Sequence, residues 1–336
     1  MGIIKVRRPG LMSTIQDLGR IGHQSSGFSP AGVCDFESAA LANYLLENEA
    51  DCAVIEMTMQ GMSFDVLKNT VIATAGADMD LFINGELFPV GRALSLKKGD
   101  HVKFGVVKEG LRTYLAVPGG FKGTEVLGSV STHVRSEIGG FKGRALERFD
   151  ILENHGSDVQ AFPYVIKKRE RQIIRRIRIM EGPEYERFSE EAKEKLVDEW
   201  YVIQNQSDRM GIRLDGEAIT TVDGSHDIIS APTQLGNVQV PKNGLPIILL
   251  NDRQSSGGYT RIATVCKVDL LKLAQMKPGE RFKFEMISIE KAQDLYTKKM
   301  NDLKVRQAIY ADREHRHYRR VTAERVESLL GGAENE

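Results

Sequence analysis

The chain has 336 residues, 41% of them hydrophobic, and its 46 basic residues balance its 46 acidic ones. A chain of this length buries a large core and exceeds the usual size of a single domain, so two domains are expected. The balanced charge argues against a broad nucleic-acid-binding surface, and three cysteines cannot complete a disulfide framework. No apolar run approaches the ~20 residues of a membrane span. We therefore expect a cytoplasmic protein that binds neither nucleic acid nor membrane.

The first half of the chain is expected to form short strands separated by glycine turns. One early helix is predicted to begin at Asp35, a good N-cap residue, and to bury the apolar side chains between positions 39 and 46. Short apolar segments predict strands at 71–75, 80–83, 101–107 and 112–117. Turns such as Asn84-Gly85 separate these strands.

The second half follows a basic run at 167–178, which is expected to be a solvated crossover and not a nucleic-acid site. A second helix is predicted at about 184–200, and the apolar run 245–250 predicts a buried strand. The segment 291–336 has few Gly and no Pro, so it is expected to be helical. The two histidines of 315–317 would point to different faces of that helix, so no metal site is expected there.

A faint internal repeat suggests two copies of one barrel-like unit. Residues 98–104 read Lys-Gly-Asp-His-Val-Lys-Phe, and residues 277–284 read Lys-Pro-Gly-Glu-Arg-Phe-Lys-Phe. Chance convergence is the alternative, because turns of this composition are common. The repeat predicts an N-terminal β-rich subdomain at 1–165, a C-terminal β-rich subdomain at 166–290 and a charged helical tail at 291–336.

The most polar segment follows the predicted strand at 245–250 and runs from Asn251 to Tyr259. It combines a carboxylate, an amide, two hydroxyls, a Gly pair and an aromatic ring. Side chains at the end of a buried strand can meet a ligand, and adjacent glycines let backbone N–H groups turn toward an anion. The segment therefore predicts a ligand-binding loop, with an ordinary hairpin loop as the alternative.

This segment and several distant motifs carry a family resemblance. The motifs stand at 14–20 (Thr-Ile-Gln-Asp-Leu-Gly-Arg), 128–132, 207–216 (beginning Ser-Asp-Arg-Met-Gly), 237–241, 244–247, 252–259 and 269–280. Their number and order, over roughly residues 3–290, make the chain resemble the carboxyltransferase subdomain of the family of 5-oxoprolinase C subunits. That family includes KipA and is related to allophanate hydrolase subunit 2 and urea carboxylase.

The resemblance implies a mostly β (α+β) fold with two cyclophilin-like β-barrel subdomains and a C-terminal helical segment. It also implies the C subunit of an ATP-dependent 5-oxoprolinase, a hydrolase complex that opens the lactam of 5-oxoproline to glutamate. ATP with Mg would phosphorylate the lactam oxygen and make it a leaving group. Because the chain carries no nucleotide-binding motif, we expect obligate partners, namely a subunit-B-like (KipI-like) protein and a subunit-A-like protein.

The same motifs supply the candidate site residues. The candidates for catalysis are Arg20 and Arg209, whose guanidinium groups suit a carboxylate or phosphoryl group, and Asp252, which could orient water or accept a proton. The candidates for substrate binding are Gln16, Asp17, Asp208, Gln239, Gln254, Ser256, Gly257, Gly258 and Tyr259. The alternatives are salt bridges from Arg20 to Asp17 and from Arg209 to Asp208, and a turn-capping role for Asp252.

Three further features also have structural alternatives. Gly119–Gly123 and Gly139–Gly143 both read Gly-Gly-Phe-Lys-Gly, so a lysine could approach a phosphate there, although hairpin turns are the commoner use. Residues 32–35 stand where the family usually shows a Gly-Ala-Met-Asp-like segment, so Cys34 could line a pocket, whereas a buried thiol is the usual role of a lone cysteine.

Two other functions remain open. One is the carboxyltransferase component of a biotin-dependent urea or amide carboxylase, with biotin attached to another chain because no biotinylation motif is present. The other is a non-catalytic regulatory protein that antagonises a KipI-like kinase inhibitor. Val130, Phe149 and Thr260 depart from the family pattern and leave the substrate open.

Overall fold

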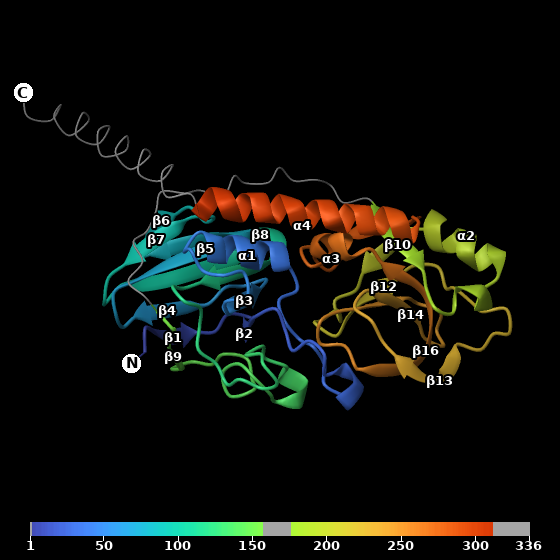
Figure 1. Cartoon of the computed structure of the whole chain (residues 1–336), viewed down its shortest axis with the longest axis horizontal. Helices are drawn as coiled ribbons and strands as arrows, with labels where there is room; N and C mark the ends of the chain where they lie inside the picture. Colours follow the sequence, from blue (N-terminus) through green and yellow to red (C-terminus); the bar gives the residue numbers. More distant parts are fainter. Residues whose placement is uncertain (1, 157–175, 312–336) are drawn as a thin grey trace, which may run out of the picture.

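The computed structural model describes residues 2–156 and 176–311. These residues form two β-sheets that lie side by side, with one long helix running along both (Figure 1). The mostly β prediction is therefore confirmed. None of the helices in these two ranges combines the length and apolar character needed to cross a bilayer.

The first sheet has nine strands and curls into an open half-barrel. Its main path runs β2-β3-β8-β4-β1-β9, and β5 pairs with β8 and also carries β6 and β7. The strands are β1 (Ile4–Arg8), β2 (Met12–Gln16), β3 (Val54–Thr58), β4 (Ser63–Val66), β5 (Thr70–Ile83), β6 (Glu86–Phe88), β7 (Ala93–Leu96), β8 (His101–Ala116) and β9 (Ile151–Leu152).

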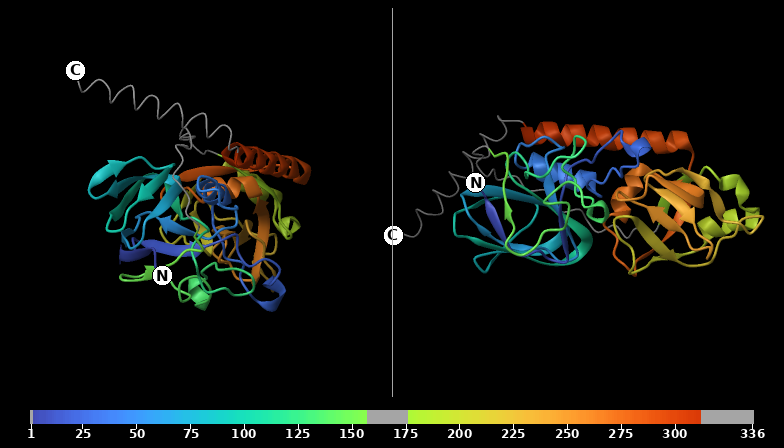
Figure 2. Two further views of the ribbon diagram at one scale, coloured as in Figure 1. Left: turned by 60° about the vertical axis from the view of Figure 1, so that its left-hand side comes forward. Right: turned by 90° about the horizontal axis from the view of Figure 1, so that it is seen from below.

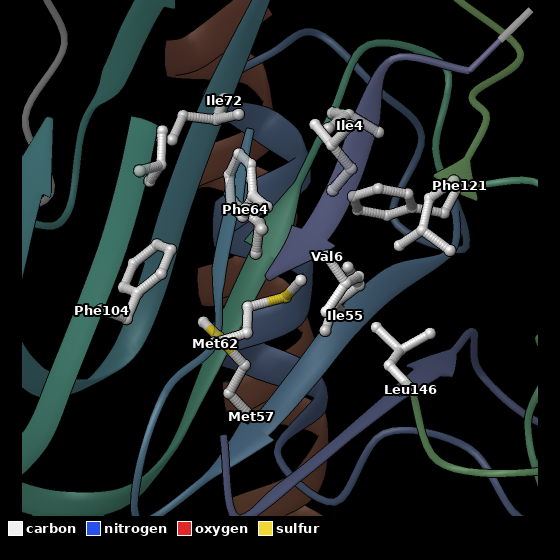
Figure 3. Close-up of a cluster of buried hydrophobic side chains, with 14 of the residues drawn as sticks. Ile4, Val6, Ile55, Met57, Met62, Phe64, Ile72, Phe104, Phe121 and Leu146 are labelled. Atoms are coloured by element: carbon white, nitrogen blue, oxygen red, sulfur yellow. The ribbon is translucent and has the colours of Figure 1, made fainter. Parts of the chain in front are cut away.

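The inner face of this half-barrel is a continuous apolar core. Its side chains come from alternate positions of the strands, as expected for a sheet with one buried face. Figure 3 shows Ile4 and Val6 of β1 near Ile55 and Met57 of β3, with Phe64 and Phe104 on one side of them and Phe121 on the other. All of these side chains are almost fully buried.

The second sheet closes into a barrel. The ring runs β10-β17-β11-β12-β15-β14-β16 and returns to β10, while β13 pairs with β16 outside the ring. The strands are β10 (Arg176–Glu181), β11 (Tyr201–Ile203), β12 (Gly211–Asp215), β13 (Asp227–Pro232), β14 (Asn237–Val240), β15 (Ile247–Leu249), β16 (Ser256–Val265) and β17 (Arg281–Met286). An aromatic group of Tyr201, Phe282 and Phe284 lies in its core, with ring centroids 5.1 to 6.5 Å apart.

Two of the predicted helices are present, one with shorter bounds. α1 (Phe36–Tyr44) begins after Asp35, whose carboxylate accepts a hydrogen bond from the Ser38 N–H, so the predicted N-cap is confirmed. The segment predicted as one helix at about 184–200 instead holds the 3-10 turn η3 (Tyr185–Arg187) and α2 (Glu190–Asp198). Ser189 caps α2 from outside and fixes its first residue.

Two pairs of predicted strands are single long strands. The segments 71–75 and 80–83 both belong to β5, and 101–107 and 112–117 both fall within β8 apart from the last residue. The β5–β8 register shifts between Gly76 and Leu81, so bulges bend the pair without ending it. Gly76 has a φ of 107° at this bend.

The C-terminal helical prediction is confirmed for the residues that the structure describes. α4 (Ile289–Ala311) packs against α1 of the first half and against α3 (Lys267–Leu273) of the second. Figure 2, seen from below, shows α4 spanning from one sheet to the other. Residues 312–336, including His315 and His317, lie outside the described residues, as does most of the basic run at 167–178.

Polar side chains also join the two sheets. Gln275, just after α3, accepts hydrogen bonds from the N–H groups of Leu111 and Arg112 in β8, each at 3.0 Å. Its amide nitrogen donates to the Asp35 carboxylate at 2.9 Å. Burial raises the pKa of Asp35, although hydrogen bonds from Ser38 and Gln275 offset part of the effect.

Candidate functional site

The segments that carry the predicted site residues meet at the junction of the two sheets. The Ala31 N–H and the Ser29 hydroxyl both donate to the Asn251 carbonyl at 3.1 Å, and the Asn251 amide donates to the Val33 carbonyl at 3.0 Å. A ring nitrogen of His133 lies 3.3 Å from the Asp252 carbonyl oxygen. The candidate site is therefore built from both halves of the chain.

Arg209 is at the centre of this junction and is only 7% exposed. Its Nε and one Nη2 hydrogen donate to the two carboxylate oxygens of Asp252 at 2.9 and 2.8 Å. Nη2 also donates to the Gly32 carbonyl at 2.7 Å, and Nη1 donates to Glu56 at 2.5 Å and lies 3.3 Å from the Cys34 sulfur. All five guanidinium donors thus have partners within the chain.

The carboxylate of Glu56 extends this network into the first sheet. It accepts hydrogen bonds from the Cys34 N–H and the Tyr114 hydroxyl, both at 2.8 Å, and Arg112 Nε lies 3.6 Å from it. Burial would raise the pKa of Glu56, but Arg209 and Arg112 lower it below its ordinary value overall. A buried carboxylate held between two guanidinium groups stays ionised.

The structure decides two of the alternatives raised by the sequence, the Arg209–Asp208 salt bridge and the buried Cys34 thiol. Asp208 does not pair with Arg209, because its carboxylate accepts from the N–H groups of Met210 and Gly211 and caps a turn. Arg209 pairs instead with Asp252, 43 residues away. Burial raises the pKa of the Cys34 thiol to about 12, so Cys34 is a protonated, buried thiol at neutral pH.

Arg20 and Asp17 form a second cluster in the first half. Asp17 accepts hydrogen bonds from the hydroxyls of Ser129 and Ser131 at 2.6 Å and from the N–H groups of Gly19 and Val130. Arg20 is 1% exposed and donates to the Ser131 carbonyl, while its Nη1 has no hydrogen-bond partner. Burial lowers the pKa of Arg20, and the charges of Asp17 and Asp252 partly offset this.

The second Gly-Gly-Phe-Lys-Gly segment makes room for this cluster. A Cβ on Gly139 would stand 2.1 Å from the Ser131 carbonyl oxygen and 2.7 Å from Arg20 Nη2, so only glycine fits. The two lysines of these segments contact protein groups, since Lys122 lies 3.5 Å from Glu153 and Lys142 lies over the Phe141 ring. The glycines thus serve turns and close packing.

Three of the predicted substrate-binding residues converge in the second half. A Cβ added to Gly257 would lie 2.6 Å from Gln239 Nε2 and 2.9 Å from Gln254 Nε2. Gln239 is 3% exposed, and its Nε2 has no hydrogen-bond partner. The missing side chain of Gly257 therefore lets two amide nitrogens pack against it, and the buried Gln239 nitrogen keeps a donor without a partner among the described residues, as a site for a carbonyl or anionic oxygen requires.

The remaining candidates for substrate binding lie partly in the buried interior and partly in strand β16. Gln16 is fully buried and uses its amide to hold Thr132 and Gly32 in place. Ser256, Gly258 and Tyr259 lie in β16 and not in the loop that the Gly pair predicted, because β13 pairs with this segment. The side chains of Ser256 and Tyr259 are exposed. Pairing between strands has overridden the turn preference of the glycines.

Several residues of the junction were not identified as site residues from the sequence. They are Glu56, Arg112, Tyr114, Arg253 and Gln24. A charged Glu56 within the apolar strand Val54–Thr58 was a usable signal, because a buried carboxylate needs a cationic partner. Among the described residues, no group of three or more His, Cys, Asp or Glu side chains could hold a metal ion.

Comparison with known proteins gives consistent results. The family model "Carboxyltransferase domain, subdomain A and B" matches residues 26–286. The chain is 33% identical to the 5-oxoprolinase C subunit of Escherichia coli over 296 residues, which cover 86% of this chain and 93% of that protein. It is 32% identical to the protein of the same name from Haemophilus influenzae, covering 85% and 92% of the two chains.

Larger proteins contain a similar region. The chain is 29% identical to urea amidolyase of Saccharomyces cerevisiae, covering 90% of this chain but 18% of that protein. The crystal structure of the K. lactis urea amidolyase aligns with 90% of this chain at a TM-score of 0.83 and 26% identity, and the chain covers 20% of it. Another solved chain, of which this one covers 55%, aligns at 32% identity and a TM-score of 0.77. From the family match and the identity to the two bacterial C subunits, we conclude that the chain belongs to the carboxyltransferase domain family that includes the 5-oxoprolinase C subunits.

Proposed function

We propose that this protein is the C subunit of an ATP-dependent 5-oxoprolinase complex, active together with a subunit-B-like and a subunit-A-like partner. The observation that carries the proposal is the 33% identity to the Escherichia coli C subunit over 93% of that protein's length. The urea amidolyases match over a fifth of their length or less, at lower identity. In identity, and in the share of the relative's length that is matched, the chain thus corresponds better to the C subunits than to these larger proteins.

The junction offers chemistry suited to a lactam. Opening an amide needs donors for the oxygen on which negative charge develops, and the buried Gln239 amide nitrogen, beside Gly257 and the Gln254 amide, is a donor without a partner among the described residues. ATP would supply the phosphoryl group that makes this oxygen a leaving group. The sequence carries no Gly-x-x-x-x-Gly-Lys-Ser/Thr motif, and we propose that ATP and Mg bind in cooperation with a partner subunit.

The structure refines the roles proposed for the charged residues. Both oxygens of Asp252 accept hydrogen bonds from Arg209, so we propose that this pair positions the 250–257 segment and does not transfer a proton itself. Arg20 keeps one unpartnered Nη1 and stays a candidate for contact with substrate. The amide pair at Gln239 and Gln254 takes over the direct contact with the lactam.

Reconstitution tests the proposal. The full chain would be mixed with its subunit-B-like and subunit-A-like partners, ATP, Mg and 5-oxoproline, and glutamate would be measured over time. We expect glutamate release that requires ATP and this chain. Glutamate release at the same rate when the chain is omitted, or none in the complete mixture, would contradict the proposal.

A carboxyltransferase acting with a biotin carrier is the second candidate, and the structural match to urea amidolyase at a TM-score of 0.83 favours it. The same oxygen-binding amides would then hold a carboxyl group during its transfer. Consumption of bicarbonate in the presence of a biotinylated carrier protein and urea, without glutamate release from 5-oxoproline, is the result that supports this candidate over the first.

A further inference from the structure

Arg253 is a buried cation with no anionic partner among the described residues. It is 7% exposed, and its guanidinium contacts two neutral oxygens, the Leu250 carbonyl at 3.4 Å and Gln24 Oε1 at 3.1 Å. Its Nε has no hydrogen-bond partner. Within residues 2–156 and 176–311 no carboxylate forms an ion pair with it, and burial alone lowers its pKa to about 10.

The nearest acidic residue in sequence is already neutralised. Asp252 directs both carboxylate oxygens to Arg209, at 2.8 and 2.9 Å. Adjacent residues thus have opposite roles: Asp252 completes an internal ion pair, and Arg253 carries an uncompensated charge. Burying an unpaired charge is costly, so such a group in a folded protein usually marks a place where a ligand supplies the missing charge.

The surroundings hold this guanidinium in a fixed orientation. Gln24 lies in η1 (Gln24–Ser26), and its amide nitrogen donates to the carbonyls of Thr233 and Ser255. These two bonds direct Gln24 Oε1 toward Arg253 Nη2. The first half of the chain therefore positions an arginine of the second half, which is a built arrangement and not a flexible surface side chain.

Arg253 is linked through Gln24 and Thr233 to the amide pair beside Gly257. Thr233 connects the two places, because its carbonyl accepts from Gln24 while its Cγ2 would lie 3.4 Å from a Cβ on Gly257. The Thr233 hydroxyl also donates to the Gln254 carbonyl. A guanidinium and two amides thus share one neighbourhood, and a planar oxyanion is the ligand that suits a guanidinium fork.

We propose that Arg253, positioned by Gln24, binds a small oxyanion, either a carboxylate or a phosphate. The proposal is separate from the choice between the two candidate functions, because lactam substrate, bicarbonate and phosphate all carry such a group. Arg253 does not take part in the Arg209 network, so we expect the fold to tolerate loss of its charge and anion binding to depend on it.

The test is a thermal-unfolding titration of the full chain at constant ionic strength, with sodium chloride as the reference salt. The probes are sodium phosphate, sodium bicarbonate, 5-oxoproline and its uncharged analogue 2-pyrrolidinone. A ligand that binds the folded state raises the Tm in proportion to its concentration and affinity. We expect at least one anion, and not 2-pyrrolidinone, to raise the Tm of the wild type.

Variants locate the effect. Arg253→Gln is expected to fold with a Tm close to that of the wild type in chloride and to bind the effective anion at least about tenfold more weakly. Arg8→Gln removes an equal charge from an exposed position and is expected to bind as the wild type does. If phosphate alone raises the Tm of the wild type, the bound oxyanion is phosphate. If 5-oxoproline alone raises it, the bound oxyanion is the carboxylate of the substrate.

Three results would overturn the proposal. They are a wild-type Tm that no anion raises, an Arg253→Gln variant that keeps the full rise, and an Arg253→Gln variant that fails to fold. In the last case the guanidinium of Arg253 would be needed to stabilise the fold, as that of Arg209 is.

Discussion

Single residues at the junction divide into those that hold the two sheets together and those that have unused hydrogen-bonding capacity. Arg209 belongs to the first group, because Asp252, Glu56 and Gly32 occupy its donors. Burial works against the charge of Arg209, but the carboxylates of Asp252 and Glu56 raise its pKa well above the ordinary value. Gln239 and Arg253 belong to the second group.

Removal of Arg209 should therefore cost stability. Arg209→Ala leaves the buried carboxylates of Glu56 and Asp252 unpaired, and we expect the free energy of unfolding to fall by about 3–5 kcal/mol. Equilibrium unfolding in urea measures this, with Arg213→Ala at an exposed position as the control. A loss as small as that of the control would show that the network contributes little.

The Gln239 and Gln254 amides beside Gly257 should matter for substrate binding and little for the fold. In Gly257→Ala the new Cβ meets the ends of two flexible side chains, Gln239 and Gln254, which must move. We expect KM for the substrate to rise at least about tenfold while the free energy of unfolding changes by less than about 1 kcal/mol. Gly258→Ala is the matched control, because its nearest atom is 3.4 Å away. Equal KM values for the two variants would contradict the assignment.

Sequence reasoning named Arg209 and Asp252 as candidates but did not pair them, and it missed Glu56, the other carboxylate that Arg209 contacts. The reason is distance along the chain: Glu56 and Arg209 are 153 residues apart, and nothing in a local pattern connects them. Asp208 was the nearer acidic residue, and it caps its own turn instead.

Among the elements, α3 is attached to the barrel by a buried carboxylate. Asp269 accepts from the Arg178 N–H, Nε and Nη2 at 2.8, 2.8 and 2.6 Å, and Lys272 lies 2.8 Å away. Burial would raise the pKa of Asp269, but the bonds from Arg178 and Lys272 lower it below the ordinary value of 3.8. Its stabilising contribution is therefore present above pH 3.8 and is lost as the pH falls through the lowered pKa.

The lowered pKa of Asp269 predicts how the free energy of unfolding depends on pH. Between about pH 6 and pH 3, the free energy of unfolding of the wild type should fall more steeply than that of Asp269→Asn, which has no carboxylate to protonate. Urea unfolding at a series of pH values checks the slope. Parallel slopes for the two proteins would mean that Asp269 has the same pKa in the folded and unfolded states.

Elements were predicted best where local chemistry decides them. The Asp35 cap and the strand at 245–250 are fixed by neighbouring residues, and α1 and β15 appear there. The bulged β5 and β8 and the strand at Ser256 were missed as such, because pairing with distant strands holds them together across residues that favour turns.

In the whole molecule, α4 and the junction segments make one body of two sheets. Lys299 of α4 lies 3.1 Å from the buried Glu37 of α1, so the helix that follows the second barrel is attached to the first half. The mostly β architecture in two β-rich halves was predictable from the family resemblance, whereas the junction of the halves depends on contacts between residues more than 100 positions apart. The site lies where neither half alone is complete.

Turnover of Gln239→Leu in the reconstituted complex tests this account most directly. Leucine has a similar size and removes a buried amide nitrogen that has no partner among the described residues, so the free energy of unfolding should stay equal or rise. We predict that ATP-dependent glutamate release from 5-oxoproline falls at least about a hundredfold, as expected when an oxyanion donor is lost. Full glutamate release by a stable Gln239→Leu protein would contradict the claim that the lactam oxygen accepts a hydrogen bond from the Gln239 amide.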